Sequence, residues 1–326
     1  MSGLVLATRA LPEPSLSTLA PDFQVRVLAG SPSESELAAE AADADALITL
    51  VSDPVTGKVL GGAPRLKIVA QYAVGVDNID REAAAARGIV VTNTPNVLTD
   101  ATADLTMALL LALARRVVEG DRFVRLGRYA GWAPDLLLGM DLKGKVLGIL
   151  GPGRIGKAVS RRARAFGMVV VASGRSAREE GDADDPPRVS FEEMLRRCDV
   201  VSIHLPMNEE TRHLFNAATL SKMKPGSFLI NTSRGPIVDE AALVRALEEG
   251  PLAGAGLDVY ENEPAVTPGL ADCDRVVLMP HAGSATVETR REMARMVVED
   301  VRRVLSGEKP LRPVLPESRE RARPEE

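Results

Sequence analysis

Short apolar runs alternate along the chain with stretches rich in alanine, leucine, arginine and glutamate. This alternation is typical of parallel strands joined by crossover helices. The runs that we interpret as strands are residues 4–8, 24–28, 46–50, 68–71, 89–92, 146–150, 169–172, 200–204, 228–231, 255–257 and 276–279. The pattern therefore predicts an α/β protein built on parallel sheets.

The strands fall into two blocks, the first of which ends near Pro95. In this block Ser33 is placed to cap a helix over Glu34–Asp43. The last helix, about Ala285–Ser306, is long enough to cross back to the first block. We therefore predict two domains, a discontinuous one of residues 1–97 plus 286–326 and a second of residues 98–285.

The second block opens with a predicted helix from Thr99 or Asp100 to about Val118. An irregular arm over residues 120–139 follows it and carries Trp132, the only tryptophan. The charged, proline-rich residues 174–189 predict a loop, and the tail from Glu317 has the composition of a disordered segment. Helix and arm (about 99–139) carry more apolar surface than a monomer should expose, so we predict a homodimer.

The composition narrows the classes of protein that remain. A net charge of −5 argues against nucleic acid or an anionic membrane as the main partner. The two cysteines form no CxxC spacing, so neither a disulfide framework nor a metal site is predicted. The N-terminus lacks the pattern of a signal peptide, and the longest apolar stretch, Met107–Ala114, is too short to span a bilayer. We expect a cytoplasmic protein.

A glycine-rich turn lies between a predicted strand and a predicted helix. Gly151, Gly153 and Gly156 form the GxGxxG spacing, in which the glycines allow a tight turn, close approach to a pyrophosphate and helix–strand packing. The helix that starts around Arg154 and Ile155 would offer its N-terminal amides to the phosphates. A turn that merely connects strand to helix is the alternative, but the flanking elements favour a dinucleotide site.

The residues after the next strand bear on which dinucleotide binds. NAD enzymes usually carry an acid there for the ribose hydroxyls, whereas this chain reads Gly174-Arg175-Ser176. Arginine and serine can hold a 2′-phosphate. NADP is therefore the predicted cofactor, with NAD possible; the alternative is that Arg175 is only a solvated loop residue.

Candidate catalytic residues follow three other strands. His281 comes just after one, Arg234 after another, and Glu261 and Glu263 after a third. Reduction of a 2-oxo acid needs a proton donor, a carboxylate behind it and a cation for the substrate carboxylate. A histidine packed in the core is the alternative for His281, and periodicity does not choose between the two glutamates.

The chain resembles the D-isomer-specific 2-hydroxyacid dehydrogenase family over nearly its whole length, most closely the glyoxylate/hydroxypyruvate reductase branch. The motifs that carry the resemblance are residues 72–80, 92–104, GPGRIG at 151–156, NTSRGPIVDE at 231–240, GAGLDVYENEP at 254–264 and PHAGSAT at 280–286. The resemblance implies two Rossmann-like, doubly wound parallel-sheet domains with the active-site cleft between them.

The family's roles pass to matching positions of this chain. The resemblance implies Arg234 as the arginine that binds the substrate carboxylate, Glu263 as the acid paired with the histidine, and His281 as the proton donor. Further cofactor contacts are expected at Thr102, Leu205, Pro206, Thr232, Ser233, Asp258 and Gly283. Substrate contacts are expected at Leu50, Val51, Ser52, Val74, Gly75 and Trp132. The tryptophan would reach a neighbouring subunit's site, or simply pack in the interface.

Two positions depart from the family's common pattern. Pro152 replaces the usual larger apolar residue of the glycine turn, and Gly174 removes any side chain at the position that selects NAD. The expected activity is NADPH-preferring reduction of glyoxylate or hydroxypyruvate to glycolate or D-glycerate. The alternatives are another D-2-hydroxyacid or phosphite dehydrogenase, or a cofactor-sensing protein like the C-terminal-binding corepressors.

Overall fold

The computed structural model describes residues 3–174, 182 and 184–316. The chain divides into two compact units, one of Met1–Leu98 with Ala285–Glu326 and one of Thr99–Ser284. Each boundary lies one residue from the expected position. The tail from Glu317, for which disorder was predicted, lies outside the described residues.

The first unit is built on a parallel sheet in the order β2-β1-β3-β4-β5. Its strands are β1 (Leu4–Ala7), β2 (Gln24–Val27), β3 (Ala46–Thr49), β4 (Ile68–Gln71) and β5 (Val90–Thr92). Its helices are η1 (Leu16–Thr18), α1 (Glu34–Ala41), α2 (Gly57–Gly61), α3 (Arg81–Ala86) and α10 (Val287–Leu305). Ser33 caps α1 as predicted, because its hydroxyl accepts from Glu36 N while the Glu36 carboxylate accepts from Ser33 N.

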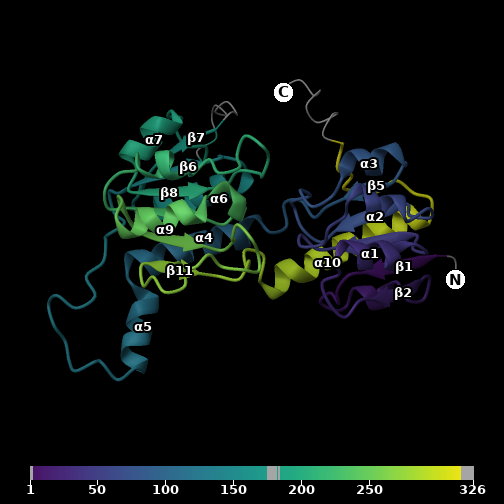
Figure 1. Ribbon diagram of the computed structural model, residues 1–326, viewed down its shortest axis with the longest axis horizontal. Helices are drawn as coiled ribbons and strands as arrows, with labels where there is room; N and C mark the ends of the chain where they lie inside the picture. The colour runs from purple at the N-terminus through teal and green to yellow at the C-terminus, as the bar shows by residue number, and fades with distance from the viewer. Residues whose placement is uncertain (1–2, 175–181, 183, 317–326) are drawn as a thin grey trace. The chain divides into compact units, whose positions relative to one another are not determined.

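Both faces of this sheet are covered. Leu47 packs against α1 and α2 in one apolar cluster, whereas Ile48 packs on the other face with Val297 of α10. The last helix therefore returns to the N-terminal unit, where Figure 1 shows it in yellow among the purple and blue elements. Beyond α10 the chain continues to β5, where Val314 N donates to Val91 O at 2.8 Å.

The second unit has a six-stranded parallel sheet in the order β11-β10-β9-β8-β6-β7. Its strands are β6 (Val146–Leu150), β7 (Val169–Ser173), β8 (Val200–Ile203), β9 (Ser227–Asn231), β10 (Leu252–Leu257) and β11 (Val276–Leu278). Its helices are α4 (Thr99–Ala114), α5 (Val117–Arg125), α6 (Arg154–Ala165), α7 (Phe191–Arg197), α8 (Ala217–Leu220), η2 (Gly235–Ile237) and α9 (Glu240–Glu248). Every predicted strand of the two blocks is present, so the α/β prediction is confirmed.

Alternate residues of the central strand β9 explain why the second unit is also doubly wound. Phe228 and Ile230 join the cluster formed with α4 and α6, whereas Leu229 joins the cluster formed with α7, α8 and α9. Successive side chains of a strand point to opposite faces, so a strand buried on both faces reads as one apolar run.

The predicted helix to Val118 is wrong in its C-terminal part. Helix α4 ends at Ala114, and Arg116 adopts a left-handed conformation (φ 52°) that interrupts the helical hydrogen bonds. A separate helix, α5, then occupies the start of the segment predicted to be irregular, and none of its residues is buried. Figure 1 shows α5 and the loop that follows it in the chain extending away from the rest of their unit.

The predicted loop 174–189 also contains paired backbone. Ala172 N donates to Pro187 O and Val189 N donates to Ala172 O, both at 2.8 Å, so residues 187–189 pair with the outer edge of β7. In the part of the chain that the structure describes, no helix is long and apolar enough to cross a membrane.

Candidate active site

Apart from Thr102 on α4, the predicted cofactor and catalytic residues of the second unit follow strands that end at one edge of its sheet. Because all neighbours in the sheet are parallel, the segments after β6, β7, β8, β9, β10 and β11 leave from the same edge. The chain reverses its winding direction between β6 and β8, and ligands of open α/β sheets bind beyond the strand ends at such a point. The glycine turn follows β6, and Leu205 and Pro206 follow β8.

Two glycines of the turn, Gly151 and Gly156, are required because neighbouring protein atoms leave no room for a side chain. Gly151 has φ +91°, and a Cβ on it would lie 2.7 Å from His204 O. A Cβ on Gly156 would lie 2.6 Å from Gly151 O and 2.8 Å from Ile149 Cγ2, so this glycine permits α6 to pack against β6.

At the third glycine, Gly153, an added side chain would point into space that no described residue fills. Among the residues that the structure describes, none lies within 4 Å of a Cβ placed on Gly153. Gly153 is also the N-cap of α6, where no described side chain caps the helix and the first turn holds no acid. Open space beside uncapped amides suits a pyrophosphate, so the residues present fit a bound dinucleotide.

The cofactor-selecting position is partly described. Gly174 follows β7, and a Cβ on it would lie 2.8 Å from Pro152 Cδ. Arg175 and Ser176, predicted to hold a 2′-phosphate, lie outside the described residues.

Four other predicted cofactor residues gather where α4 meets the sheet edge. The hydroxyl of Thr102 donates to Gly283 O at 3.2 Å, and Thr232 Oγ1 lies 2.9 Å from the hydroxyl of Thr106 on α4. The hydroxyl of Ser233 donates to Asn231 Oδ1 at 2.9 Å, which orders the segment between β9 and Arg234.

His281 and Glu263 form a pair, with Nδ1 2.9 Å from Oε2. Their side chains are 33% and 35% exposed, so both remain reachable by a ligand. Burial acts to raise the pKa of Glu263, but the hydrogen bond and charge of His281, the Tyr260 amide and the charge of Arg234 outweigh it and hold the pKa below 4.5. Glu263 is therefore ionised at neutral pH.

Several hydrogen bonds fix the backbone that carries His281. The histidine has a left-handed conformation (φ 52°), and its amide donates to Asp258 O at 2.8 Å. The carboxylate of Asp258 accepts from the amides of Ala282 and Gly283 at 2.6 and 2.8 Å. Burial raises the pKa of Asp258 above its ordinary value. Asp258, predicted as a cofactor contact, thus also shapes the histidine loop.

Tyr260 links the glutamate and the histidine. Its amide donates to Glu263 Oε1 at 3.0 Å, and its hydroxyl donates to Met279 O at 2.8 Å, two residues before His281. Sequence reasoning missed this role, although the tyrosine lies inside a motif that had been singled out.

The loop of Arg234 contacts the loop of Glu263 directly. A Cβ on Gly235 would lie 1.8 Å from Tyr260 O and 2.5 Å from Glu261 N, so only glycine allows the two backbones to come this close. Asn231 Nδ2 donates to Arg234 O at 2.9 Å and holds the same loop to β9.

Glu261, the competing acid, has other partners. Its Oε1 lies 2.6 Å from His213 Nε2, and its amide donates to Glu240 Oε1 at 2.8 Å. The side chain of His213, which is 40% exposed, is thus paired with Glu261. The third histidine, His204, has its Nε2 2.9 Å from the hydroxyl of Ser202, and burial lowers its pKa to about 4.

The predicted substrate residues 50–52 and 74–75 belong to the first unit, where they follow β3 and β4. Asn78 connects the two loops: its Nδ2 donates to Leu50 O and to Asp53 O at 3.0 and 2.8 Å, and its Oδ1 accepts from Gln71 at 2.7 Å. The Gln71 amide also donates to Gly75 O at 3.2 Å. Sequence reasoning missed Asn78 because nothing in its local pattern reveals which loop its amide meets.

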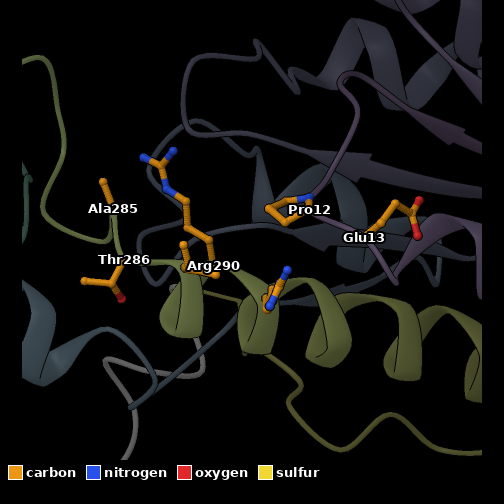
Figure 2. Close-up of a pocket in the computed structure, with 7 residues that line it drawn as sticks. Pro12, Glu13, Ala285, Thr286 and Arg290 are labelled. Atoms are coloured by element: carbon orange, nitrogen blue, oxygen red, sulfur yellow. The ribbon is translucent and has the colours of Figure 1, made fainter.

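Two further features do not include the residues of these clusters. Trp132, the predicted cross-subunit residue, lies in the arm and is 83% exposed. A pocket in the first unit is lined by Pro12 and Glu13 and by Arg290 and Arg291 of α10, and Figure 2 shows Arg290 extending away from the helix. None of the predicted substrate residues lines this pocket. The described residues also hold no group of three or more side chains suited to bind a metal ion.

Residues 107–283 match the model of the family "D-isomer specific 2-hydroxyacid dehydrogenase, NAD binding domain". A glyoxylate reductase of Thermococcus litoralis is 47% identical over 317 residues, which are 95% of this chain and 96% of that protein.

Solved structures give the same result. The TT0316 protein of Thermus thermophilus is 48% identical with a TM-score of 0.90 and covers 96% of this chain and 100% of its own. The NADPH-dependent glyoxylate/hydroxypyruvate reductase of Sinorhizobium meliloti, in complex with NADP and malonate, is 35% identical with a TM-score of 0.86 over 96% of this chain and 97% of its own. This chain therefore belongs to the D-isomer specific 2-hydroxyacid dehydrogenase family.

Proposed function

We propose that this protein is an NADPH-preferring reductase that converts glyoxylate or hydroxypyruvate to glycolate or D-glycerate. The observation that carries the proposal is the His281–Glu263 pair, at 2.9 Å, beside the Arg234 loop and on the same sheet edge as a dinucleotide turn. The relatives named glyoxylate reductase, and the related reductase in complex with NADP, support the choice of substrate and cofactor.

In the proposed mechanism the turn at Gly151, Gly153 and Gly156 holds the pyrophosphate on the amides of α6. The nicotinamide, when bound, supplies the hydride for the carbonyl carbon. Arg234 pairs with the substrate carboxylate. Since Glu263 engages Nδ1 of His281, the Nε2 side delivers the proton to the carbonyl oxygen. We also propose that residues 50–52 and 74–75 contact the substrate.

A panel of initial rates tests the proposal. Glyoxylate, hydroxypyruvate, pyruvate and the oxo partner of phosphoglycerate are each assayed with NADPH and NADH, together with phosphite oxidation. The highest kcat/KM is expected for glyoxylate or hydroxypyruvate with NADPH. Cofactor binding without turnover of any substrate would instead favour a cofactor-sensing protein, and turnover of phosphite alone would favour a phosphite dehydrogenase.

Glu263→Gln should change the pH dependence of reduction. Without the carboxylate the protonated form of His281 is less stable, so the fall in reduction rate with rising pH should begin at a lower pH. Rates measured between pH 5 and 9 under saturating cofactor test this. Glu261→Gln is the matched control, because Glu261 pairs with His213, and its profile should keep the wild-type midpoint. Equal shifts in both variants would contradict the assignment of Glu263.

Arg175→Ala should weaken NADPH by about ten- to a hundredfold, because a hydrogen bond to a charged group contributes about 1.5–3 kcal/mol. NADH lacks the 2′-phosphate and should bind as before. Titration of both dinucleotides into the two proteins measures the effect. Equal weakening of both cofactors would show that Arg175 does not select NADP.

We also propose that the enzyme is a two-fold homodimer formed through α5 and the arm. The exposed apolar side chains there are Val117, Val118, Val124, Leu126, Tyr129, Trp132 and Leu138. Val117 and Val124 share one face of α5, so V117D/V124D should give a monomer in light scattering at micromolar concentration. Val27→Asp, at an exposed valine of the first unit, should leave the dimer intact. A monomeric wild type would refute the proposal.

A further inference from the structure

The end of β7 meets the glycine turn at a point where space is scarce. Gly151 N donates to Ser173 O at 2.9 Å, so the first residue after β6 and the last residue of β7 are held side by side. Gly151 has φ +91°, and a Cβ on it would meet His204 O. This conformation fixes the direction in which the chain continues to Pro152. Pro152 is buried, and its ring faces Gly174.

A side chain at position 174 would collide with that ring. An added Cβ would lie 2.8 Å from Pro152 Cδ, whereas carbon atoms in contact are separated by about 3.5–4.0 Å. The Cδ atom is bonded to the backbone nitrogen, so it cannot turn away as the end of a flexible side chain could. The backbone at Gly174 gives no other reason for glycine, because its φ lies outside the left-handed range.

We infer that Pro152 is a specificity-determining residue that keeps position 174 free of a side chain and thereby excludes the carboxylate on which NAD recognition depends. This inference rests on the proposed preference for NADP. An acid at the end of this strand accepts hydrogen bonds from the ribose hydroxyls of NAD and repels a 2′-phosphate. Pro152 acts by volume alone, from the turn that also receives the pyrophosphate.

A double-mutant cycle of thermal stability tests, without any cofactor, whether Pro152 excludes a side chain at position 174. Glycine-to-alanine changes at positions without strain stabilise proteins by restricting the unfolded chain, whereas overpacking destabilises them. In the apo-protein Gly174→Ala should lower the Tm by about 2–12 °C when residue 152 is proline. In the Pro152→Ala background the same change should leave the Tm unchanged or raise it. A Gly174→Ala effect of the same sign and size in both backgrounds would overturn the inference.

A second cycle tests specificity. Gly174→Asp alone should weaken the binding of NADPH and NADH together, because the turn must shift. In P152A/G174D the kcat/KM ratio of NADH to NADPH should rise by about ten- to a hundredfold over that of Pro152→Ala. The Kd for NADH should fall relative to the Kd for NADPH. If Gly174→Asp shifts the ratio equally in both backgrounds, Pro152 has no role in specificity. A wild type that prefers NADH would refute the proposed NADP preference, and the Tm cycle would still decide whether Pro152 excludes a side chain.

Discussion

Replacing His281 by asparagine should lower kcat for oxo-acid reduction by about 10²–10⁴-fold, the contribution typical of a positioned general acid. Asparagine is chosen because His281 has a left-handed conformation (φ 52°), which asparagine adopts more readily than alanine does. The backbone loop held by Asp258 should therefore survive, and NADPH should bind with nearly unchanged affinity. Steady-state kinetics and a cofactor titration measure the two effects separately.

The chain provides a matched control for this experiment. His213 is also left-handed (φ 49°) and also pairs with a glutamate, Glu261. His213→Asn should cost at most a few-fold in kcat, because this histidine has no proton to deliver in the proposed mechanism. If both variants lose the same activity, or if His281→Asn retains wild-type kcat while folded, His281 is not the proton donor.

Gly235→Ala should abolish activity and strongly destabilise the second unit. The added Cβ would lie 1.8 Å from Tyr260 O, and the atom it meets is backbone that cannot rotate away. Relief requires the Arg234 loop and the Glu263 loop to separate, which disrupts the hydrogen bonds of Tyr260 and Glu261. We expect the free energy of unfolding to fall by more than about 4 kcal/mol, a size that is typical only of severe overpacking or of disrupted hydrogen-bond networks. Thermal unfolding together with kcat/KM measures it.

Gly30→Ala is the control for this substitution, because in the described part of the chain only Arg9 Nη1, at 3.8 Å, lies within 4 Å of its added Cβ. Its Tm and activity should match those of the wild type. If Gly235→Ala does not fold, Tyr260→Phe provides a milder test, because it removes only the hydroxyl bond to Met279 O and should fold with a reduced kcat. A fully active Gly235→Ala protein would show that the two loops need not touch.

Local patterns were sufficient for most of the fold. The apolar runs predicted every strand, because a strand covered on both faces is apolar along its length. The helix to Val118 failed because a single left-handed residue, Arg116, ends α4, and helical propensity does not register one dihedral angle. The pairing of residues 187–189 with β7 was missed for a related reason, since a charged, proline-rich composition does not exclude hydrogen bonds to a sheet edge.

By itself the sequence determined the series of parallel strands, the glycine turn and the placement of Arg234, Glu263 and His281 just after strands. Each of these depends on residues close together in the chain, where spacing and side-chain type carry the information. The resemblance to the family implied Glu263 rather than Glu261 as the partner of His281, and the tertiary structure shows this pair. Only the tertiary structure decided that Gly235 lies against Tyr260 and that Pro152 lies against position 174. These contacts join segments that are far apart in sequence, and their geometry follows from how strands and loops pack, which no local pattern encodes.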